Sequence, residues 1–239
     1  MERATFVIGD VHGMYDTLVA LLSKFPKISN IVFVGDLIDR GEKSAQVVNF
    51  VRENGYKCVQ GNHEATFIQF FRDYFNGANS SLLEVKWHSW LYYNGGFETL
   101  VSYDFYLDKK NSESVIKQIK SDYLWMQSLP YYLELETTHK SNLPVIVSHS
   151  NITNVWHLRE SKKDFATFKE TLQRTRNLDC NSSAEIINIY GHTPQSVQKK
   201  HKNCINVDSG CCFYKYEGYG KLSAYWIEND KIITQRAIV

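Results

Sequence analysis

Short apolar runs and helical patterns alternate along the first third of the chain. Three runs that end at a glycine predict buried strands: residues 4–8, 31–34 and 57–60. After each run, apolar positions recur at three- and four-residue spacing and predict amphipathic helices: residues 15–25, 44–53 and 65–75. Right-handed crossovers would place the three strands parallel and adjacent in one sheet.

The rest of the chain continues the strand pattern after a helical, aromatic middle. Within residues 76–140 the pattern predicts a helix over 121–129 and a strand over 131–136. Further strands are expected at residues 144–147, 186–190 and 205–210, with a closing hairpin of 221–228 and 231–238. Residues 151–181 are polar without a firm period and are expected to run over the surface. We therefore expect one α/β domain spanning residues 1–239.

Composition and charge exclude several classes of protein. The chain has 239 residues, 43% of them hydrophobic, which is enough for a sizeable core and rules against disorder. A formal net charge of +1 gives no global electrostatic case for nucleic acid or a membrane surface. No apolar run reaches 18 residues, and a first strand beginning near Thr5 leaves no room for a signal peptide. A cytoplasmic location is expected.

The cysteines are expected to be reduced residues that pack in the core. They are odd in number, scattered, and without a paired C-x-x-C spacing, which argues against a disulfide framework or a thiolate zinc site. They are Cys58, Cys180, Cys204, Cys211 and Cys212.

Polar residues follow five of the predicted strands where each strand ends. In an open α/β sheet, this edge is where ligands bind. A single histidine at such a position is more often a structural, hydrogen-bonded group than a ligand. Five independent strand ends with ligand-type residues favour one shared cluster instead. The candidate metal ligands are Asp10, His12, Asp36, Asn62, His149 and His192.

These oxygen and nitrogen ligands predict a pair of divalent cations. The set contains no thiolate and suits Mn, with Fe, Zn or Co as alternatives. Asp10, His12 and Asp36 would hold one ion. Asp36 would also bridge to a second ion, held with Asn62, His149 and His192. Ions roughly 3.5–4 Å apart suit displacement at phosphorus, with a water or hydroxide between them as nucleophile.

The two central loops also carry residues suited to acid catalysis and phosphate binding. His63 is next to a ligand without being one, which leaves its imidazole free to protonate a leaving group. Asp39 is the candidate to orient and charge-stabilise that imidazole. Arg40 would bind phosphoryl oxygens through its planar guanidinium, although Asp39–Arg40 could also be a plain surface ion pair.

Three sequence blocks resemble the phosphoprotein phosphatase branch of the calcineurin-like metallophosphoesterases. They are Gly-Asp-Val-His-Gly at 9–13, Gly-Asp-Leu-Ile-Asp-Arg-Gly at 35–41 and Gly-Asn-His-Glu at 61–64, and the later His149 and His192 blocks also match. The resemblance implies a two-sheet β-sandwich flanked by helices, two metal ions at the sheet edge, and hydrolysis of phosphomonoesters. Small relatives carry a second phosphate-binding arginine in a Trp-Asn-Arg motif that is not intact here. Arg174 is the residue predicted to take this phosphate-binding role, and Arg159 is the alternative.

The leading functional hypothesis is a metal-dependent phosphatase acting on phosphoserine, phosphothreonine and also phosphotyrosine proteins. A dinucleoside tetraphosphate hydrolase, or another nucleotide phosphoesterase, is the alternative. Asp39 argues against the symmetrical tetraphosphatases, which resemble this chain but typically carry alanine there. A non-catalytic phosphate-binding scaffold is disfavoured by the complete ligand set. The expected partner is a phosphorylated protein or peptide, with no nucleic acid or membrane partner, and the chain is expected to be a monomer.

Overall fold

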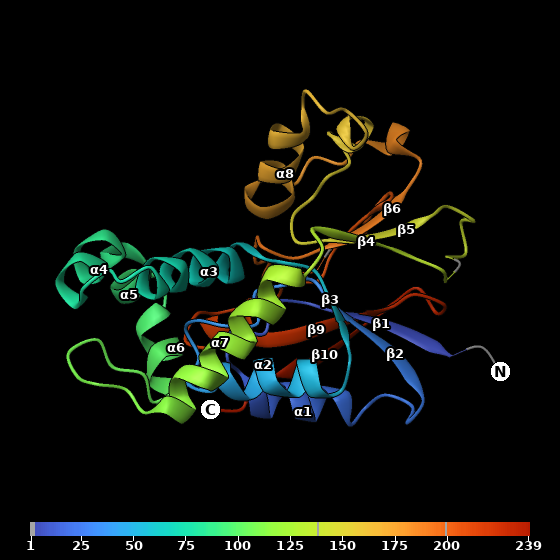
Figure 1. The fold of residues 1–239 in the computed structure, drawn as a ribbon. Coiled ribbons are helices and arrows are strands. Elements are labelled where there is room, and N and C mark those ends of the chain that lie inside the picture. Colours follow the sequence, from blue (N-terminus) through green and yellow to red (C-terminus); the bar gives the residue numbers. More distant parts are fainter. Residues whose placement is uncertain (1–2, 138, 199) are drawn as a thin grey trace.

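Two five-stranded sheets face each other in the computed structural model, which describes residues 3–137, 139–198 and 200–239 (Figure 1). The first sheet has the order β10-β9-β1-β2-β3, and the second has the order β4-β5-β6-β8-β7. The strands are β1 (Ala4–Ile8), β2 (Ser29–Phe33), β3 (Lys57–Cys58), β4 (Tyr132–Leu135), β5 (Val145–Ser148), β6 (Ile187–Tyr190), β7 (Lys200–His201), β8 (Cys204–Asn206), β9 (Lys221–Trp226) and β10 (Lys231–Arg236).

Helices cover the outer faces of both sheets, so the predicted sandwich flanked by helices is confirmed. The α-helices are α1 (Tyr15–Leu22), α2 (Ser44–Glu53), α3 (Asn62–Phe75), α4 (Ser80–Lys86), α5 (His88–Tyr93), α6 (Gly96–Ser102), α7 (Glu113–Ser128) and α8 (Phe165–Arg174). Helices α1 and α2 lie below the first sheet in Figure 1, whereas α8 lies above the second. Short 3₁₀ turns are η1 (Trp156–Leu158), η2 (Ser182–Ala184) and η3 (Cys211–Phe213).

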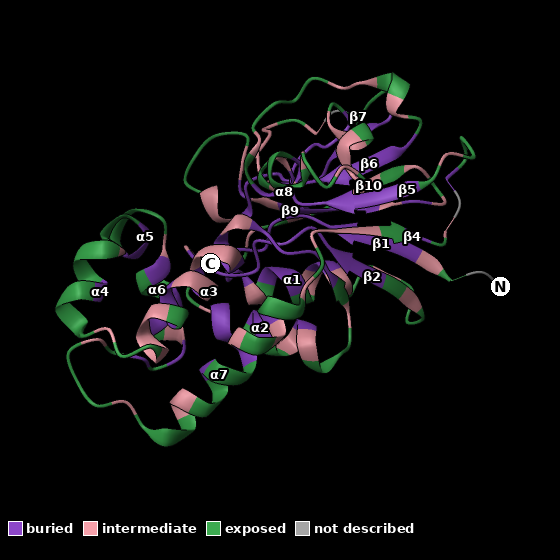
Figure 2. Cartoon of the chain, turned by 45° about the horizontal axis from the view of Figure 1, so that its top comes forward, coloured by how far each residue is buried: buried purple, intermediate pink, exposed green. Residues whose placement is uncertain are grey.

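The continuous apolar runs reflect strands that are buried on both faces. In β1, Phe6 and Ile8 join the core under the helices, whereas Val7 joins the core between the sheets. In β5, Ile146 packs toward α8 while Val147 packs between the sheets. Figure 2 shows the buried positions concentrated on the strands and on the helix faces toward them.

Strand direction brings the polar loops together. Strands β1, β2 and β3 are parallel, and so are β5, β6 and β8. The predicted parallel arrangement of the first three strands is therefore confirmed. Strand β9 pairs antiparallel with β1 and with β10, which confirms the closing hairpin. The carboxyl ends of five of these six strands, all except β8, feed the loops that carry the candidate ligands.

Several predicted boundaries differ from the structure. The helix expected over 121–129 is longer, because α7 begins at Glu113. Helix α3 begins at Asn62 rather than at residue 65, so Asn62 and His63 lie in its first turn. The segment 151–181 contains α8, whose Phe168 and Leu172 are buried against the second sheet. The charged and polar residues of this segment surround the narrow apolar stripe of α8, so the helical spacing of apolar residues is hard to see in the sequence.

The expectation that all cysteines are reduced is wrong for two of the five. Cys180 and Cys204 form a disulfide, with their Cα atoms 5.9 Å apart. Cys180 lies in the connection between α8 and β6, whereas Cys204 is the first residue of β8. This pairing depends on the tertiary path of the connection and leaves no local spacing signal. Cys58, Cys211 and Cys212 are free thiols.

Candidate active site

Asp36 lies at the centre of the residues that converge at the sheet edge. One possible cation-binding group is Asp36 with His12 and His63, and another is Asp36 with His149 and His192. Within the second group, Asp36 Oδ2 lies 3.3 Å from His149 Nε2, which is 3.1 Å from His192 Nδ1. Asp36 is common to both groups, whereas the first group contains His63, which was predicted not to be a ligand, and does not contain Asp10.

Several site residues have an unusual backbone conformation. The φ angles are positive for five candidate residues: His12 (47°), Asp36 (50°), Asp39 (73°), Arg40 (70°) and His192 (69°). This left-handed region costs free energy for residues other than glycine, and such outliers cluster at functional sites. The loops are therefore held by their surroundings in conformations that the residues alone would disfavour.

Hydrogen bonds fix which nitrogen of each histidine faces the site. His12 Nδ1 and His149 Nδ1 each lie 2.8 Å from a main-chain carbonyl, of Ile38 and Val34 respectively, and therefore donate. Their Nε2 atoms then present lone pairs toward Asp36. His192 Nε2 likewise faces the Arg174 carbonyl at 3.2 Å, which leaves its Nδ1 as an acceptor.

The donor set fits a bound cation. His149 Nε2 and His192 Nδ1 lie close to each other and to Asp36, and Asn62 Oδ1 lies 2.9 Å from His149 Nε2. Carboxylate and amide oxygens and the two imidazole lone pairs are all acceptors when the rings are neutral. Acceptors converging at this distance repel one another unless a proton or a cation lies between them. A divalent cation satisfies all four residues at once.

The electrostatic environment favours the neutral form of His12 and His192. For His149, burial alone would lower the pKa, but the adjacent Asp36 carboxylate outweighs it and raises that pKa. Burial, with the nearby Arg40 guanidinium, lowers the pKa of His12 well below its ordinary value. Burial, with the neighbouring His149, lowers the pKa of His192 to about 3. Neutral imidazole is the form that binds metal.

Asp10 lies against the turn that carries His192. Its carboxylate accepts a hydrogen bond from the His192 main-chain N–H at 3.1 Å. A Cβ at Gly191 would lie 2.0 Å from Asp10 Oδ1, so this position needs glycine. Burial, with the nearby charge of Asp208, raises the pKa of Asp10 well above its ordinary value. A cation would relieve this cost.

His63 and Asp39 form a close pair beside Asp36. His63 Nδ1 lies 2.5 Å from Asp39 Oδ2, and His63 Nε2 lies 3.8 Å from Asp36 Oδ2. Burial alone would lower the pKa of His63, but the Asp36 and Asp39 carboxylates outweigh it and raise that pKa. The structure thus places the His63 imidazole and the Asp39 carboxylate side by side.

Two residues that sequence reasoning missed hold Asp39 in place. Trp90 Nε1 donates to Asp39 Oδ2 at 2.8 Å, and Thr99 Oγ1 donates to Asp39 Oδ1 at 2.7 Å. Both come from α5 and α6, in the helical, aromatic middle of the chain, where no site residue was predicted from the sequence. They are 51 and 60 positions from Asp39, so no local pattern connects them to it.

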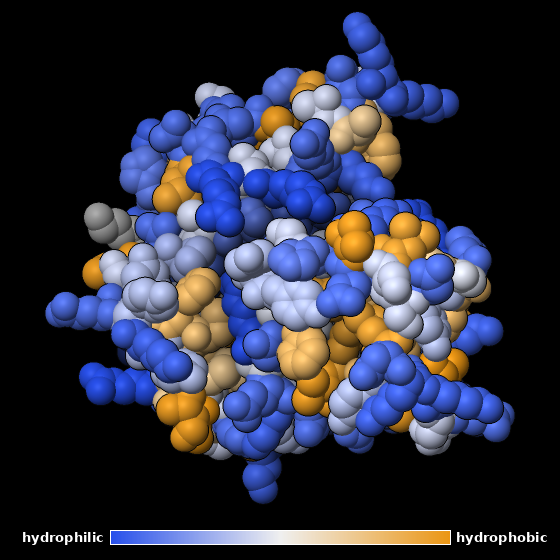
Figure 3. Space-filling model, turned by 90° about the vertical axis from the view of Figure 1, so that its left-hand side faces the viewer, coloured by the Kyte–Doolittle hydropathy of each residue, from blue (hydrophilic) through white to orange (hydrophobic). Residues whose placement is uncertain are grey.

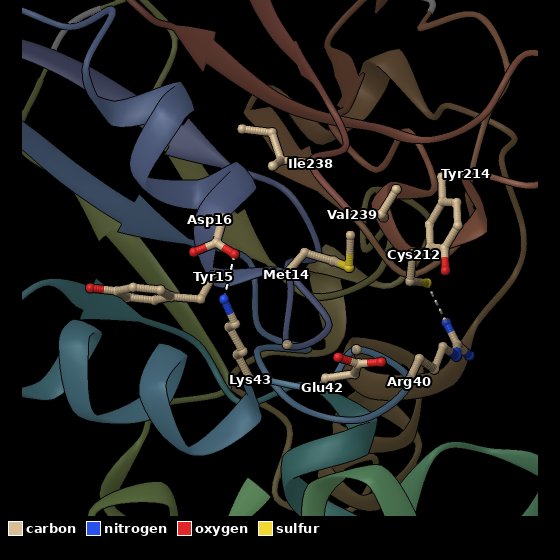
Figure 4. A pocket seen from close by; sticks show the side chains of 12 residues that line it. Met14, Tyr15, Asp16, Arg40, Glu42, Lys43, Cys212, Tyr214, Ile238 and Val239 are labelled. Atoms are coloured by element: carbon tan, nitrogen blue, oxygen red, sulfur yellow. Dashed lines mark hydrogen bonds and ion pairs between the residues drawn. The ribbon is translucent and has the colours of Figure 1, made fainter.

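Arg40 lies between the candidate ligands and a neighbouring pocket. Its Nη1 is 2.8 Å from His12 Nε2, and its guanidinium carbon lies 5.0 Å from the centre of the Phe213 ring. On its other side is a pocket of about 340 Å³, which Tyr214 and the Asp16–Lys43 ion pair also line (Figure 4). The Arg40 guanidinium can therefore contact a group bound at the candidate ligands or a group bound in the pocket.

The two arginines considered for a second phosphate contact lie differently. Arg174 is exposed at the end of α8, and its main-chain carbonyl faces His192. Arg159 lies over the Trp156 ring at 4.7 Å, and both line a separate surface pocket. Arg174 is thus the nearer to the site. Arg176, which sequence reasoning did not consider, is close enough to contribute to the low pKa of His192.

Two buried carboxylates complete the site and were not among the predicted residues. Glu64 accepts from the main-chain N–H groups of Asp36 (2.9 Å), Leu37 (2.8 Å) and Gly61 (2.9 Å), which fixes the central loop. Burial, with the charge of Asp36, raises the pKa of Asp208 to about 6. Glu64 stands in the 61–64 block and Asp208 follows β8, so the sequence pattern could have identified both residues as part of the site.

No helix within residues 3–137, 139–198 and 200–239 is long and apolar enough to cross a membrane.

Comparison with known proteins agrees with this geometry. The family model for calcineurin-like phosphoesterases matches residues 5–196. The asymmetrical bis(5'-nucleosyl)-tetraphosphatase PrpE of Bacillus subtilis (strain 168) is 28% identical over 232 residues, covering 87% of this chain and 86% of that protein. Serine/threonine-protein phosphatase 1 of Salmonella typhimurium is 26% identical over 214 residues, covering 88% of each.

Solved structures show the same fold. A crystal structure of a provisionally assigned diadenosine tetraphosphatase aligns with a TM-score of 0.64 over 99% of this chain and 94% of that chain, at 19% identity. The cold-active protein-tyrosine phosphatase of a psychrophilic Shewanella aligns with a TM-score of 0.56 over 98% and 78%, at 18% identity. Since the family model spans most of the chain, this protein belongs to the calcineurin-like phosphoesterase family, whose members hydrolyse phosphoesters.

Proposed function

We propose that this enzyme is a metal-dependent protein phosphatase that removes phosphate from serine, threonine and tyrosine residues. The observation that carries the proposal is the His63–Asp39 pair, held by Trp90 and Thr99 beside the Asp36 cluster and Arg40. Removal of phosphate from a protein side chain leaves an alkoxide or phenolate that needs a proton, and His63 is placed to supply it.

The proposed cation sites divide the ligands as the sequence suggests. Asp10, His12 and Asp36 would hold one cation, with Asp10 rather than His63 completing the group around His12 and Asp36. Asp36 would hold the other cation together with Asn62, His149 and His192. When bound, two divalent cations, proposed to be Mn²⁺, would supply Lewis-acid activation of water and would neutralise charge on the phosphoryl group.

The protein's own residues handle the proton and the phosphoryl oxygens. With Nδ1–H donated to Asp39, the raised pKa keeps a proton on His63 Nε2, which His63 gives to the leaving oxygen. Arg40 donates to the single Nε2 lone pair of His12, which is the same lone pair that a cation requires. Loading the site would therefore release Arg40 to bind phosphoryl oxygens. Arg174 is proposed as a second phosphate contact.

The test of catalysis uses p-nitrophenyl phosphate with Mn²⁺ supplied. We expect activity that a chelator abolishes and that Mn²⁺ restores. Asp36→Asn is the sharpest variant, because asparagine tolerates the positive φ and only the charge is lost. His63→Asn tests the acid in the same assay. Equal, background-level rates for wild type and both variants in the presence of metal would refute the proposal.

A second candidate function is hydrolysis of a dinucleoside tetraphosphate. It is supported by the similarity to PrpE-named relatives and by the pocket beside Arg40, whose Tyr214 and Met14 could contact a nucleoside. A panel of phosphopeptides and dinucleoside polyphosphates separates the two functions. We expect the higher kcat/KM with phosphopeptides, and dominant cleavage of the dinucleotide would replace the first proposal with the second.

A further inference from the structure

A second, larger groove runs away from the site between α3 and α8. It has a volume of about 720 Å³. Ile68 and Arg72 line it from α3, while Lys169, Gln173 and Arg174 line it from α8. Tyr131, the residue before β4, also lines it. Gln173 donates to Gln60 Oε1 at 2.9 Å, which joins the two sides at a residue two positions before the proposed ligand Asn62.

The groove has a surplus of positive charge. Three cations line it, Arg72, Lys169 and Arg174, against one carboxylate, Glu170. Among the described residues, no ion pair joins any of these three cations to a carboxylate. The whole chain carries only +1, so this surplus is a local feature. From the side that carries α3 and α4, strongly hydrophilic side chains gather between the upper part of the molecule and the helices below (Figure 3).

The length of the groove suits an extended segment of peptide. Arg72 is ten residues after Asn62 in α3, which places it about 15 Å along the helix from the site. An extended chain covers this distance in about four or five residues. A phosphorylated residue at the site would therefore place side chains three to five positions away beside Arg72 and Lys169.

The lining favours a peptide over a nucleotide in this groove. A nucleobase needs an open aromatic face for stacking, and Tyr131 is the aromatic residue in the described lining. The Lys169 Nζ atom already lies 4.5 Å from the centre of that ring. Gln69 and Gln127 instead offer amide groups, which pair well with a peptide main chain.

We propose that the α3–α8 groove selects protein substrates with acidic residues three to five positions from the phosphorylated residue. This inference rests on the proposed phosphatase function and names its substrate class. Arg72 and Lys169 act as specificity residues that meet the acidic side chains without touching the reacting atoms. Because both cations are on the surface, the preference must weaken as salt rises.

The test compares kcat/KM for phosphopeptides that differ only in flanking residues. One has Asp and Glu at three to five positions after the phosphoserine, one has them before it, and one is neutral. For wild type we expect a five- to tenfold preference for one acidic peptide at low salt. Arg72→Gln with Lys169→Gln should abolish that preference, whereas Lys117→Gln on the exposed face of α7 should keep it. All variants should hydrolyse p-nitrophenyl phosphate at the wild-type rate.

A binding experiment separates failure of this inference from failure of the proposed function. A fluorescent acidic peptide without phosphate should bind wild type and bind the double variant at least fivefold more weakly, by anisotropy. Equal kcat/KM for acidic and neutral peptides, or a preference that survives the double substitution, would overturn the inference. If no phosphopeptide is cleaved, the proposed function fails. If wild type and the double variant then also bind the fluorescent peptide equally, the inference that the groove binds acidic peptides fails as well.

Discussion

At the scale of single residues, Asp39 determines how His63 can act. Its carboxylate accepts from His63, Trp90 and Thr99, so each oxygen already has a partner and the imidazole has one orientation. Trp90 itself packs beneath the glycine turn at 95–96, where a Cβ on Gly96 would lie 2.5 Å from its ring. The protonation of His63 therefore depends on residues far from it in the sequence.

We predict that Asp39→Asn lowers kcat for p-nitrophenyl phosphate about 10- to 100-fold with little change in KM. The amide oxygen can still accept from Trp90 and His63, and the amide nitrogen can donate to Thr99, so the geometry is kept while the charge is lost. Loss of that charge also lowers the pKa of His63 and moves the alkaline limb of the kcat profile to lower pH. Bound metal, measured by elemental analysis, should stay at the wild-type ratio, and a fall in metal content would contradict this assignment.

The sequence made most of this residue-scale arrangement predictable, because each ligand candidate follows a strand in a short block. Asp208 also follows a strand, so its place in the site could have been predicted from the sequence. The roles of Trp90 and Thr99 could not, because their hydrogen bonds to Asp39 span 51 and 60 positions and depend on how α5 and α6 pack. A surface arginine such as Arg174 is equally hard to assign, because its position depends on where α8 ends.

At the scale of elements, the turn between α5 and α6 supports the loop that carries Arg40. Gly95 has a φ of +87°, and its carbonyl accepts from Arg40 N at 3.3 Å. A Cβ at Gly95 would lie 2.1 Å from that nitrogen. The turn therefore positions Arg40 through direct main-chain contact.

We predict that Gly95→Ala reduces kcat/KM at least tenfold and destabilises the fold by roughly 2–3 kcal/mol. Gly77→Ala is the matched control, because Gly77 has the same φ of +87° with nothing within 4 Å of its Cβ position. In Gly77→Ala the free energy of unfolding should fall only by the cost of the backbone conformation, about 1 kcal/mol, and the activity should be unchanged. Thermal unfolding and steady-state kinetics measure both effects, and equal losses of activity would rule out the proposed contact with Arg40.

A second element, the β9–β10 hairpin, carries an ionic cluster away from the site. Burial alone would raise the pKa of Asp230, but hydrogen bonds from Lys140, Lys200 and Tyr225 hold it well below its ordinary value. A lowered pKa means that the charged carboxylate stabilises the folded state. This contribution is complete above about pH 4, the ordinary value, and disappears as pH falls through the lower folded value.

We predict that Asp230→Asn lowers the free energy of unfolding at pH 7 by about 1–2 kcal/mol. The difference from wild type should shrink steadily below pH 4, as the wild-type carboxylate takes up a proton. Urea unfolding at pH 7, 4 and 3 measures it. A difference that stays constant over this range would show that the loss comes from packing rather than charge.

At the scale of the whole molecule, two sheets bring six strand ends to one place. Periodicity in the sequence predicted every described strand except β7, the parallel order of β1, β2 and β3, and the closing hairpin, because those features are local or follow from crossover handedness. The path of residues 151–185 was not predictable in the same way. Helix α8 and the Cys180–Cys204 link depend on how this connection packs against the second sheet.

We predict that reduction of the Cys180–Cys204 disulfide destabilises the protein by about 3 kcal/mol, the value expected for closing a loop of this length. Cys180→Ser should show the same loss, measured by urea unfolding. A reductant should lower the stability of wild type and leave Cys180→Ser unchanged. A similar response of both proteins to the reductant would assign the effect to another thiol.

The left-handed conformations around Asp36 also restrict how this protein can be re-engineered. In a saturation library at positions 12, 36, 39, 40 and 192, valine, isoleucine and threonine should be depleted whatever chemistry is selected. Glycine, asparagine, aspartate and histidine should survive, because their side chains tolerate that region of backbone space. An attempt to change the metal preference by exchanging ligands is therefore restricted to the few residue types that tolerate these backbone conformations. This restriction applies whether or not a metal is bound.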